Sequence, residues 1–358
     1  MKKVFLKCVF EQNLGDDLLI NILCSKYSSS QFYIISDKDI DSFPNNLKII
    51  KVPSLLYRLF RKTAFKLKKM NFIDSIIISQ LDYVVVIGGS MFMETKSMSD
   101  NYDLIWYKKL VKPLYIIGSN IGPIHTNDYL KRLKEEVFSS AVDISLRDQK
   151  SYNMISDLSA ARYTSDLVFT YDVSPYKTIK SSKKVIISVI DCEKKSSQMK
   201  NVNSQLYEEK IKELISYFYT QGFEVELFSF CKKEGDERII DKIINELPYY
   251  EIKKYFYTGD IDSALRELAT SSIIVGSRFH ANILGMILKK SVIPIIYNDK
   301  TRNMLNDINF KGKVIDLENI VDFNVDDLDE SDLEYKCNVE LYQKTAQLHF
   351  QELAKILE

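Results

Sequence analysis

The sequence has no excess of charge of either sign, because 49 Lys and Arg residues balance 49 Asp and Glu residues among its 358 positions. A nucleic-acid-binding domain usually has a basic excess, so this balance argues against that class. There is also no run of about eighteen uncharged apolar residues, which a transmembrane helix would need. The first apolar run contains Lys7 and predicts a β-strand rather than a signal peptide. We therefore expect a cytoplasmic protein that does not bind nucleic acid.

Cysteine is scarce too, and the five cysteines are scattered without a C-x-x-C pair. This spacing excludes a disulfide framework and a cysteine zinc site. The chain has no G-x-G-x-x-G fingerprint, and the Gly88-Gly89 turn lacks the lysine and serine of a Walker motif. Binding of NAD or ATP is therefore disfavoured. No cluster of metal-ligating residues stands out, and we expect neither a metal nor a cofactor.

Apolar residues make up 46% of the chain and aromatic residues 12%, which is enough for the packed cores of two domains. Runs of β-forming residues alternate with helical patterns, as in βαβ units of a mainly parallel sheet. The expected strands are 3–10, 31–36, 47–52, 82–87, 114–118, 143–147, 185–190, 223–230, 272–276 and 292–296. The expected helices are 15–27, 54–70, 103–110, 128–140, 148–157, 204–221, 235–246, 261–269 and 279–288.

A polar stretch without periodicity, residues 172–184, predicts a linker between two domains. We expect an α/β fold in which two doubly wound domains face each other across a cleft. The predicted domains are residues 1–175 and 176–335, and the apolar spacing near the C-terminus predicts a closing helix within 336–358.

The most informative stretch is 271–282, where a β-type run ends at Gly276 and a helical pattern begins. Arg278 offers forked donors that fit a carboxylate or a phosphate. His280 can move a proton near neutral pH. Because ligands bind at the carboxyl ends of strands in such sheets, the pattern predicts a site for a small anion undergoing acid–base chemistry.

A second loop, residues 11–17, turns an expected strand into a helix. Gly15 permits close approach of the backbone, and Asp16 or Asp17 can cap the helix. Two interpretations remain open at this point. Asn13 and Asp16 either bind a ligand or belong to an ordinary capped turn.

A third loop follows the buried strand expected at 82–87. Gly88, Gly89 and Ser90 have little side chain, so backbone N–H groups can face an anion or a sugar. A plain Gly-Gly turn is the alternative.

Two more strand ends carry cations. Arg147 precedes Asp148, a natural N-cap, and either lines a site or forms a surface ion pair. Tyr297 and Lys300 follow the strand expected at 292–296, so they lie beside Arg278 if the two strands are neighbours. Of the two other histidines, His125 is a weaker loop candidate and His349 is expected to be structural.

Taken in order, these loops resemble the polysaccharide pyruvyl transferase family. The matching pieces are Asn13-Leu-Gly15-Asp16, Gly88-Gly89-Ser90, Ile121-Gly122-Pro123, Arg147-Asp148-Gln-Lys-Ser151, Asp166, Ser277-Arg278-Phe-His280 and Tyr297-Asn-Asp-Lys300. The family more often has leucine where Phe279 stands, a third glycine where Ser90 stands, and proline after the aspartate that matches Asp166.

The resemblance implies a GT-B-like pair of Rossmann-like domains and transfer of pyruvate from phosphoenolpyruvate onto a sugar of a polysaccharide or lipid-linked repeat unit, giving a ketal. His280 and Arg278 are the expected catalytic residues. The expected phosphoenolpyruvate contacts are Arg147, Ser277, Arg278 and Lys300, and the C-terminal domain is the expected phosphoenolpyruvate side. The expected acceptor contacts are Asn13, Asp16, Gly88, Gly89 and Ser90, on the N-terminal side.

Two other functions fit the same pattern. One is a GT-B-type glycosyltransferase that uses a nucleotide sugar, and the other is a non-catalytic sugar- or nucleotide-binding protein of glycan assembly.

Residues 54–72 form a basic amphipathic pattern, with six Lys or Arg residues, no acidic residue, and interleaved Leu and Phe. Such a helix can lie on an anionic bilayer surface. It can equally pack on the sheet with a solvated basic side. The first interpretation places the protein peripherally at the inner face of the plasma membrane.

Overall fold

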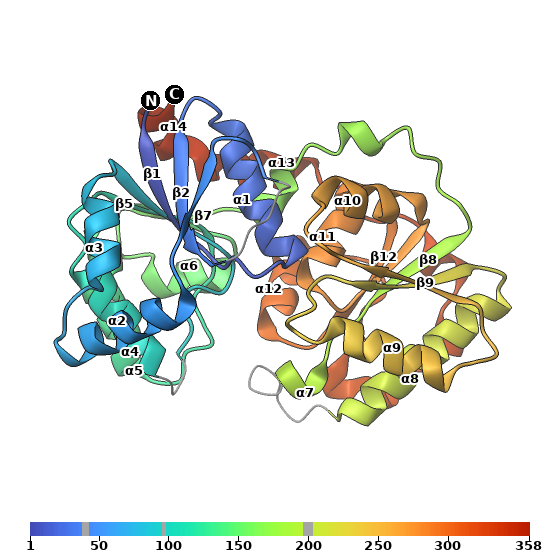
Figure 1. The fold of residues 1–358 in the computed structure, drawn as a ribbon. Helices are drawn as coiled ribbons and strands as arrows, with labels where there is room; N and C mark the ends of the chain where they lie inside the picture. Colours follow the sequence, from blue (N-terminus) through green and yellow to red (C-terminus); the bar gives the residue numbers. More distant parts are fainter. Residues whose placement is uncertain (38–42, 95–97, 196–202) are drawn as a thin grey trace. The chain divides into compact units, whose positions relative to one another are not determined.

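The computed structural model describes residues 1–37, 43–94, 98–195 and 203–358 (Figure 1). Internal contacts divide the chain into two compact units. The first unit comprises Met1–Phe10, Leu19–Leu167 and Lys344–Glu358, and the second comprises Glu11–Leu18 and Val168–Gln343. Residues 11–18, which the predicted division counted with the N-terminal domain, thus pack within the second unit. The end of the chain packs within the first.

The first unit is built on a seven-stranded sheet in which all neighbouring strands are parallel. In spatial order the strands are β3 (Leu47–Lys51), β2 (Gln31–Ser36), β1 (Lys3–Lys7), β4 (Tyr83–Ile87), β5 (Leu114–Ser119), β6 (Ala141–Leu146) and β7 (Ala161–Tyr163). The strand order reverses between β1 and β4. In open parallel sheets that switch point is where ligands bind, so the residues after β4 are well placed.

Burial explains why the central strands of this sheet read as continuous apolar runs. Val84, Val85, Val86 and Ile87 are completely buried, as expected for a parallel strand covered on both faces. The helices of this unit are α1 (Leu14–Lys26) from Leu19 onward, α2 (Ser54–Lys66), α3 (Phe72–Ser79), α4 (Met98–Lys108), α5 (Asn127–Glu136), α6 (Gln149–Ile155) and the C-terminal α14 (Gln351–Leu357). Both chain ends lie on this unit (Figure 1). The hydroxyl of Tyr27 donates to the carbonyl of Phe350, which ties the C-terminal segment to α1.

The second unit holds a six-stranded sheet, again with parallel neighbours. In spatial order its strands are β10 (Ile252–Phe256), β9 (Glu224–Ser229), β8 (Lys184–Ser188), β11 (Ile273–Gly276), β12 (Ser291–Ile296) and β13 (Ile315–Asp316). Its helices are α7 (Cys192–Lys195), α8 (Ser204–Thr220), α9 (Asp236–Glu246), α10 (Ile261–Thr270), α11 (Phe279–Ile287), α12 (Asp299–Asp307) and α13 (Glu340–Ala346). Here the order reverses between β8 and β11. The two parallel sheets confirm the predicted α/β fold.

The structure departs from the predicted elements mainly at edges and breaks. Strands β7, β10 and β13 were missed, and each lies at or near a sheet edge. The helix predicted over 54–70 ends earlier, at Lys66, and Lys68 just beyond it adopts a left-handed conformation with a φ of 51°. The next helix, α3, which Asn71 caps, was not predicted. The predicted closing helix is also broken, since a 3-10 turn at Gln347–Phe350 separates α13 from α14. Among the described residues, no helix is long and apolar enough to cross a membrane.

Candidate functional site

The strand-to-helix turn predicted around Arg278 is present in the second unit. Strand β11 ends at Gly276 and α11 begins at Phe279, so Arg278 is the N-cap residue and His280 lies in the first helical turn. The turn lies at the switch point, because the backbone N–H of Arg278 donates to Ser188 Oγ at the end of β8, over 3.1 Å. The hydroxyl of Ser277 is buried and lies 2.9 Å from the Tyr207 hydroxyl.

The side chain of Arg278 is 5% exposed and contacts two carboxylates. Its Nε donates to Asp236 Oδ2 over 3.0 Å, and its Nη2 donates to the other oxygen of the same carboxylate. Its Nη1 donates to Glu234. Burial alone would lower the pKa of Arg278, but Asp236 and Glu234 raise it well above the usual value. The guanidinium is therefore permanently charged and rigidly oriented.

A second cation, Lys195 at the end of α7, contacts the same carboxylate of Glu234. Lys195 is 7% exposed, so its charge is partly removed from water. Burial would raise the pKa of Glu234, but the positive charges of Arg278 and Lys195 outweigh that effect and lower it to about 2. Glu234 is thus a carboxylate in a strongly positive environment.

Tyr297 and Lys300 complete this cationic region. Strands β11 and β12 pair directly, so the prediction that Tyr297 and Lys300 follow a neighbouring strand is confirmed. The Lys300 ammonium lies 5.8 Å from the centre of the Phe279 ring. Burial would raise the pKa of Tyr297, yet Lys300, Lys195 and Arg278 lower it below the usual value. Three cations that outweigh the burial of a phenol mark a site suited to an anion.

His280 packs against the segment at residues 11–18, at Gly15 in the first turn of α1. A Cβ placed on Gly15 would lie 1.8 Å from His280 Nδ1, so only glycine allows the imidazole to approach this closely. Asn13 precedes α1, and its side-chain oxygen accepts a hydrogen bond from the N–H of Gly15 over 3.0 Å. Asp17 lies inside the first turn of α1, which begins at Leu14, and its buried carboxylate accepts a hydrogen bond from the hydroxyl of Tyr257 over 2.8 Å. Asp16 lies in the first turn of α1.

The first unit holds a separate constellation around Arg147, at the end of β6. Nη1 of Arg147 donates to Asp166 Oδ2 over 3.0 Å, and its Nη2 donates to Asn120 Oδ1 over 2.7 Å. The open alternative of a surface ion pair is wrong, because the Arg147 side chain is 3% exposed and that of Asp166 is completely buried. A Cβ on Gly89 would lie 2.5 Å from the guanidinium. Gly89 therefore leaves the space that Arg147 occupies.

The neighbouring loops of this unit are fixed by hydrogen bonds. Asp148 caps α6 as predicted, since its carboxylate accepts from the N–H of Ser151 over 2.8 Å. The carbonyl of Gly88 accepts from Ser119 Oγ, and that of Gly89 from the N–H of Asn120, both over 2.7 Å. Ser90 is half-buried beside them. The roles predicted for Arg147, Gly88, Gly89 and Ser90 in binding substrates stay predictions.

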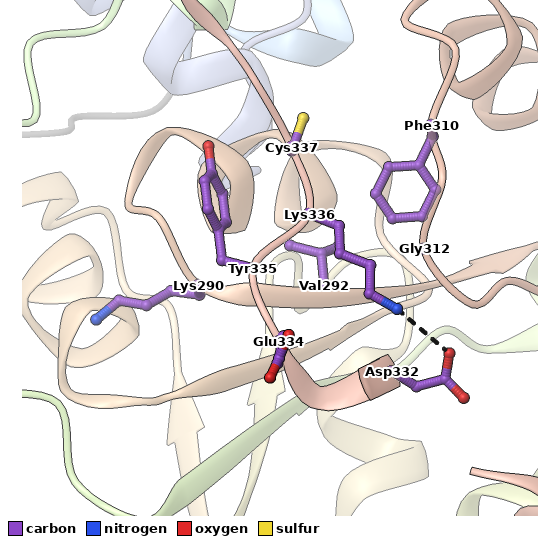
Figure 2. A pocket seen from close by; sticks show the side chains of 9 residues that line it. All are labelled: Lys290, Val292, Phe310, Gly312, Asp332, Glu334, Tyr335, Lys336 and Cys337. Carbon is purple, nitrogen blue, oxygen red and sulfur yellow. Dashed lines mark ion pairs between the residues drawn. The ribbon is translucent and has the colours of Figure 1, made fainter. Parts of the chain in front are cut away.

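Figure 2 shows a pocket elsewhere in the second unit, lined by Lys290, Val292 and Lys336 among others. Lys290 and Val292 lie at the start of β12, whereas Arg278 and Lys300 follow the carboxyl ends of β11 and β12. We place the candidate site at the carboxyl ends, where parallel sheets bind ligands and where the cations converge. Within the described ranges, no group of three or more His, Cys, Asp or Glu residues could hold a metal ion.

Lys195, Glu234 and Asp236 were missed by the sequence reasoning. Lys195 comes after β8, which neighbours β11 in the sheet. Glu234 and Asp236 come after β9, the strand on the other side of β8. The signal was available, because charged residues just beyond the carboxyl ends of adjacent strands share one edge of the sheet. Loops with lysines or acidic residues are common in this sequence, however, and only the order of the strands in the sheet shows that these three residues lie near Arg278.

The comparisons with known proteins identify the class of this chain. Residues 13–299 match the sequence profile described as polysaccharide pyruvyl transferase. The chain belongs to the polysaccharide pyruvyl transferase family, which confirms the resemblance found in its loops. A relative is the amylovoran biosynthesis protein AmsJ of Erwinia amylovora, 21% identical over 272 residues. That match covers 69% of this chain and 64% of AmsJ, so the chain spans less than two thirds of this relative's length.

Two solved structures have a similar fold. HepE of Anabaena, in complex with UDP and glucose, matches with a TM-score of 0.56 at 10% identity, covering 100% of this chain and 99% of HepE. The UDP-GlcNAc 2-epimerase of Methanocaldococcus jannaschii, in complex with UDP-GlcNAc and UDP, matches with a TM-score of 0.57 at 8% identity, covering 99% of this chain and 100% of the epimerase. At such identities the similarity shows the GT-B-like fold alone.

Proposed function

We propose that this protein transfers pyruvate from phosphoenolpyruvate onto two hydroxyls of a sugar in a polysaccharide or a lipid-linked repeat unit. The products are a cyclic ketal and inorganic phosphate. The observation that carries the proposal is the group of three cations, Lys195, Arg278 and Lys300, around the buried Tyr297 on the same edge of the sheet as His280. Membership of the family supports the reaction type.

The reaction needs a proton donor and a stabiliser of negative charge. Phosphoenolpyruvate gains a proton at its methylene carbon, which leaves an oxocarbenium-like centre that the first sugar hydroxyl attacks. The second hydroxyl then displaces phosphate. Of the two hydroxyl protons, one replaces the proton taken up by the methylene carbon and the other leaves with the phosphate. We assign the proton transfers to His280, a contribution of about 10²–10⁴-fold. Arg278 stabilises charge on the phosphate as it leaves, and this chemistry needs no metal or other cofactor.

The test is phosphate release from phosphoenolpyruvate by the purified protein. We expect release only with a suitable acceptor glycan, and loss of turnover in His280→Ala and Arg278→Ala. Arg266→Ala is the matched control, because Arg266 is an exposed arginine that pairs with Asp262 on α10. Full activity of both site variants would refute the assignment. Turnover of a nucleotide sugar, inhibited by UDP, would favour a glycosyltransferase, and ligand binding without any turnover would favour an assembly protein.

We further propose that α2 and α3 lie on an anionic membrane at the cytoplasmic side, where a lipid-linked acceptor would be reached. The structure exposes the apolar residues of this segment: Leu55 is 66% exposed, Leu59 56%, Leu67 62% and Phe72 65%. A different side of α2 attaches the helix to the rest of the unit, because the Tyr57 hydroxyl donates to the buried carboxylate of Asp74 over 2.9 Å. The exposed Leu and Phe side chains are thus not needed to pack the helix, which disfavours the sheet-packing interpretation.

A further inference from the structure

We propose that Lys195 and Arg278 form an oxyanion subsite in the second unit, and that the carboxylate of Glu234 occupies this subsite until a phosphate or carboxylate group of the ligand displaces it. The inference rests on the proposed function, because it specifies how an anionic donor would be held. It assigns ligand binding to Lys195, and it means that the carboxylate of Glu234 competes with the ligand for the same two cations.

The contacts of Glu234 are those expected of a bound anion. One of its oxygens, Oε2, contacts both Nη1 of Arg278 and Nζ of Lys195. An oxygen of a phosphate or a carboxylate would satisfy the same two donors in the same place. Arg and Lys side chains that converge on one oxygen are a common arrangement for binding oxyanions.

The second carboxylate on Arg278 is fixed, whereas Glu234 can leave. Asp236 is completely buried, and its Oδ2 also accepts hydrogen bonds from the N–H groups of Phe230 and Cys231, over 2.9 and 3.0 Å. The side chain of Glu234 is 32% exposed and extends from the loop before α9. Removing Asp236 would leave two buried backbone N–H groups and the Nε and Nη2 atoms of Arg278 without this partner, but Glu234 can rotate into water. Asp236 therefore positions Arg278, and Glu234 is the exchangeable partner.

The charges around the subsite also favour a ligand with two negative charges. Arg278, Lys195 and Lys300 supply three positive charges, and Asp236 and Glu234 supply two negative ones. The net charge of these groups is +1 with Glu234 in place and +2 when Glu234 moves away, and +2 matches the charge of a phosphate dianion. The lowered pKa values of Glu234 and Tyr297 report this positive environment, although burial acts against both.

The test is calorimetric titration of the purified full chain with inorganic phosphate. Glu234→Gln removes the competing charge and keeps the side-chain shape, so we expect phosphate to bind about tenfold more tightly. Lys195→Met removes a donor, and we expect binding to weaken by about tenfold. The matched controls are Glu193→Gln on α7 and Lys253→Met on β10, since both residues are exposed. Unchanged or weaker binding in Glu234→Gln overturns the proposal.

Hydrogen exchange of the wild-type protein tests the same proposal without relying on a variant that could fail to fold. Phosphate that displaces Glu234 should release the loop at residues 232–235, and the amide hydrogens of that loop should exchange faster when phosphate is bound. Slower or equal exchange would mean that Glu234 stays in place, which also overturns the proposal. Phosphate binding at this subsite without phosphoenolpyruvate-dependent turnover would refute the proposed function alone.

Discussion

Nη1 of Arg147 lies 3.0 Å from Oδ2 of Asp166, and both side chains are buried in the first unit. If the carboxylate is removed, the guanidinium stays buried without its counter-charge, which costs about 3–5 kcal/mol. We therefore expect Asp166→Ala to lower the free energy of unfolding of the first unit by that amount. Urea unfolding followed by tryptophan fluorescence measures it, because Trp106 is the only tryptophan and is buried in this unit.

An exposed ion pair of the same unit provides the control for this substitution. Lys131 and Glu135 lie 3.9 Å apart on α5, with side chains 70% and 62% exposed. Solvent screens such a pair, so Glu135→Gln should change the free energy of unfolding by less than about 1 kcal/mol. Equal losses in the two variants would contradict the view that burial makes the Arg147–Asp166 pair important.

The contact between Gly15 and His280 gives a second prediction. A methyl group on Gly15 would overlap the imidazole, with the Cβ 1.8 Å from Nδ1, so Gly15→Ala must displace His280 or the loop. We expect turnover to fall about as far as in His280→Ala, by roughly 10²–10⁴-fold. The rate of phosphate release from phosphoenolpyruvate is the measurement.

A double variant separates the steric effect from a general loss of structure. In His280→Ala the imidazole is gone, so adding Gly15→Ala should lower the thermal stability no further than His280→Ala does alone. In the wild-type background the same glycine substitution should destabilise the second unit. If Gly15→Ala kept full activity, the close packing of His280 against this loop could not be required for catalysis.

The sequence predicted the parts of the fold that rest on local patterns. The run ending at Gly276 and the helix from Phe279 were found almost to the residue, because a fully buried strand and an apolar helix carry strong signals. Strand β10 was missed, since Lys253 and Lys254 are exposed at the sheet edge and break the apolar run. The helix predicted over 54–70 extended past the true end of α2 at Lys66, because Lys68 adopts a conformation that lysine rarely takes.

Only part of the candidate site could be predicted from the sequence, because contacts between residues far apart in the chain leave no local pattern. Arg278 and His280 lie on one turn and could be found together, but the partners of Arg278 stand about 40 residues earlier, after β9. No local pattern connects Asp236 with Arg278, since their contact arises from the strand order of the sheet. The same holds for Arg147 and Asp166, whose pairing changed a suspected surface contact into a buried one.

His349 gives a prediction about pH. Its ring is completely buried: Nε2 donates to the carbonyl of Ser165 over 2.8 Å, and Nδ1 lies 2.8 Å from Ser145 Oγ. Burial lowers the pKa of His349 from 6.5 to about 4, so the folded protein keeps the ring neutral. Between these values the unfolded chain binds the proton and the folded chain does not. The contribution to stability is therefore complete above pH 6.5 and is lost as the pH falls towards 4.

We expect this single group to account for a loss of about 3 kcal/mol between pH 7 and pH 4. His349→Gln should be less stable at pH 7, because the buried hydrogen bonds are disturbed, but its stability should fall less steeply with acid. His125→Gln, at an exposed loop position, should keep the wild-type slope. The measurement is the free energy of unfolding, followed through Trp106 fluorescence at several pH values. Equal dependence of this free energy on pH in the wild type and His349→Gln would contradict the assignment.

The exposed face of α2 gives the last prediction. Leu59 is 56% exposed and Phe60 39%, so Leu59→Ser with Phe60→Ser removes apolar area from the surface while the buried contacts of Tyr57 and Ala64 remain. We expect the wild type to float with vesicles containing anionic phosphatidylglycerol, and this double variant to float several-fold less. Val111→Ser is the matched control, because Val111 is 85% exposed outside this face and should not affect flotation.

Binding should also weaken at high salt, since each Lys or Arg near the bilayer contributes about 1 kcal/mol. Equal recovery of wild type with neutral and anionic vesicles would exclude this face as an electrostatic membrane contact.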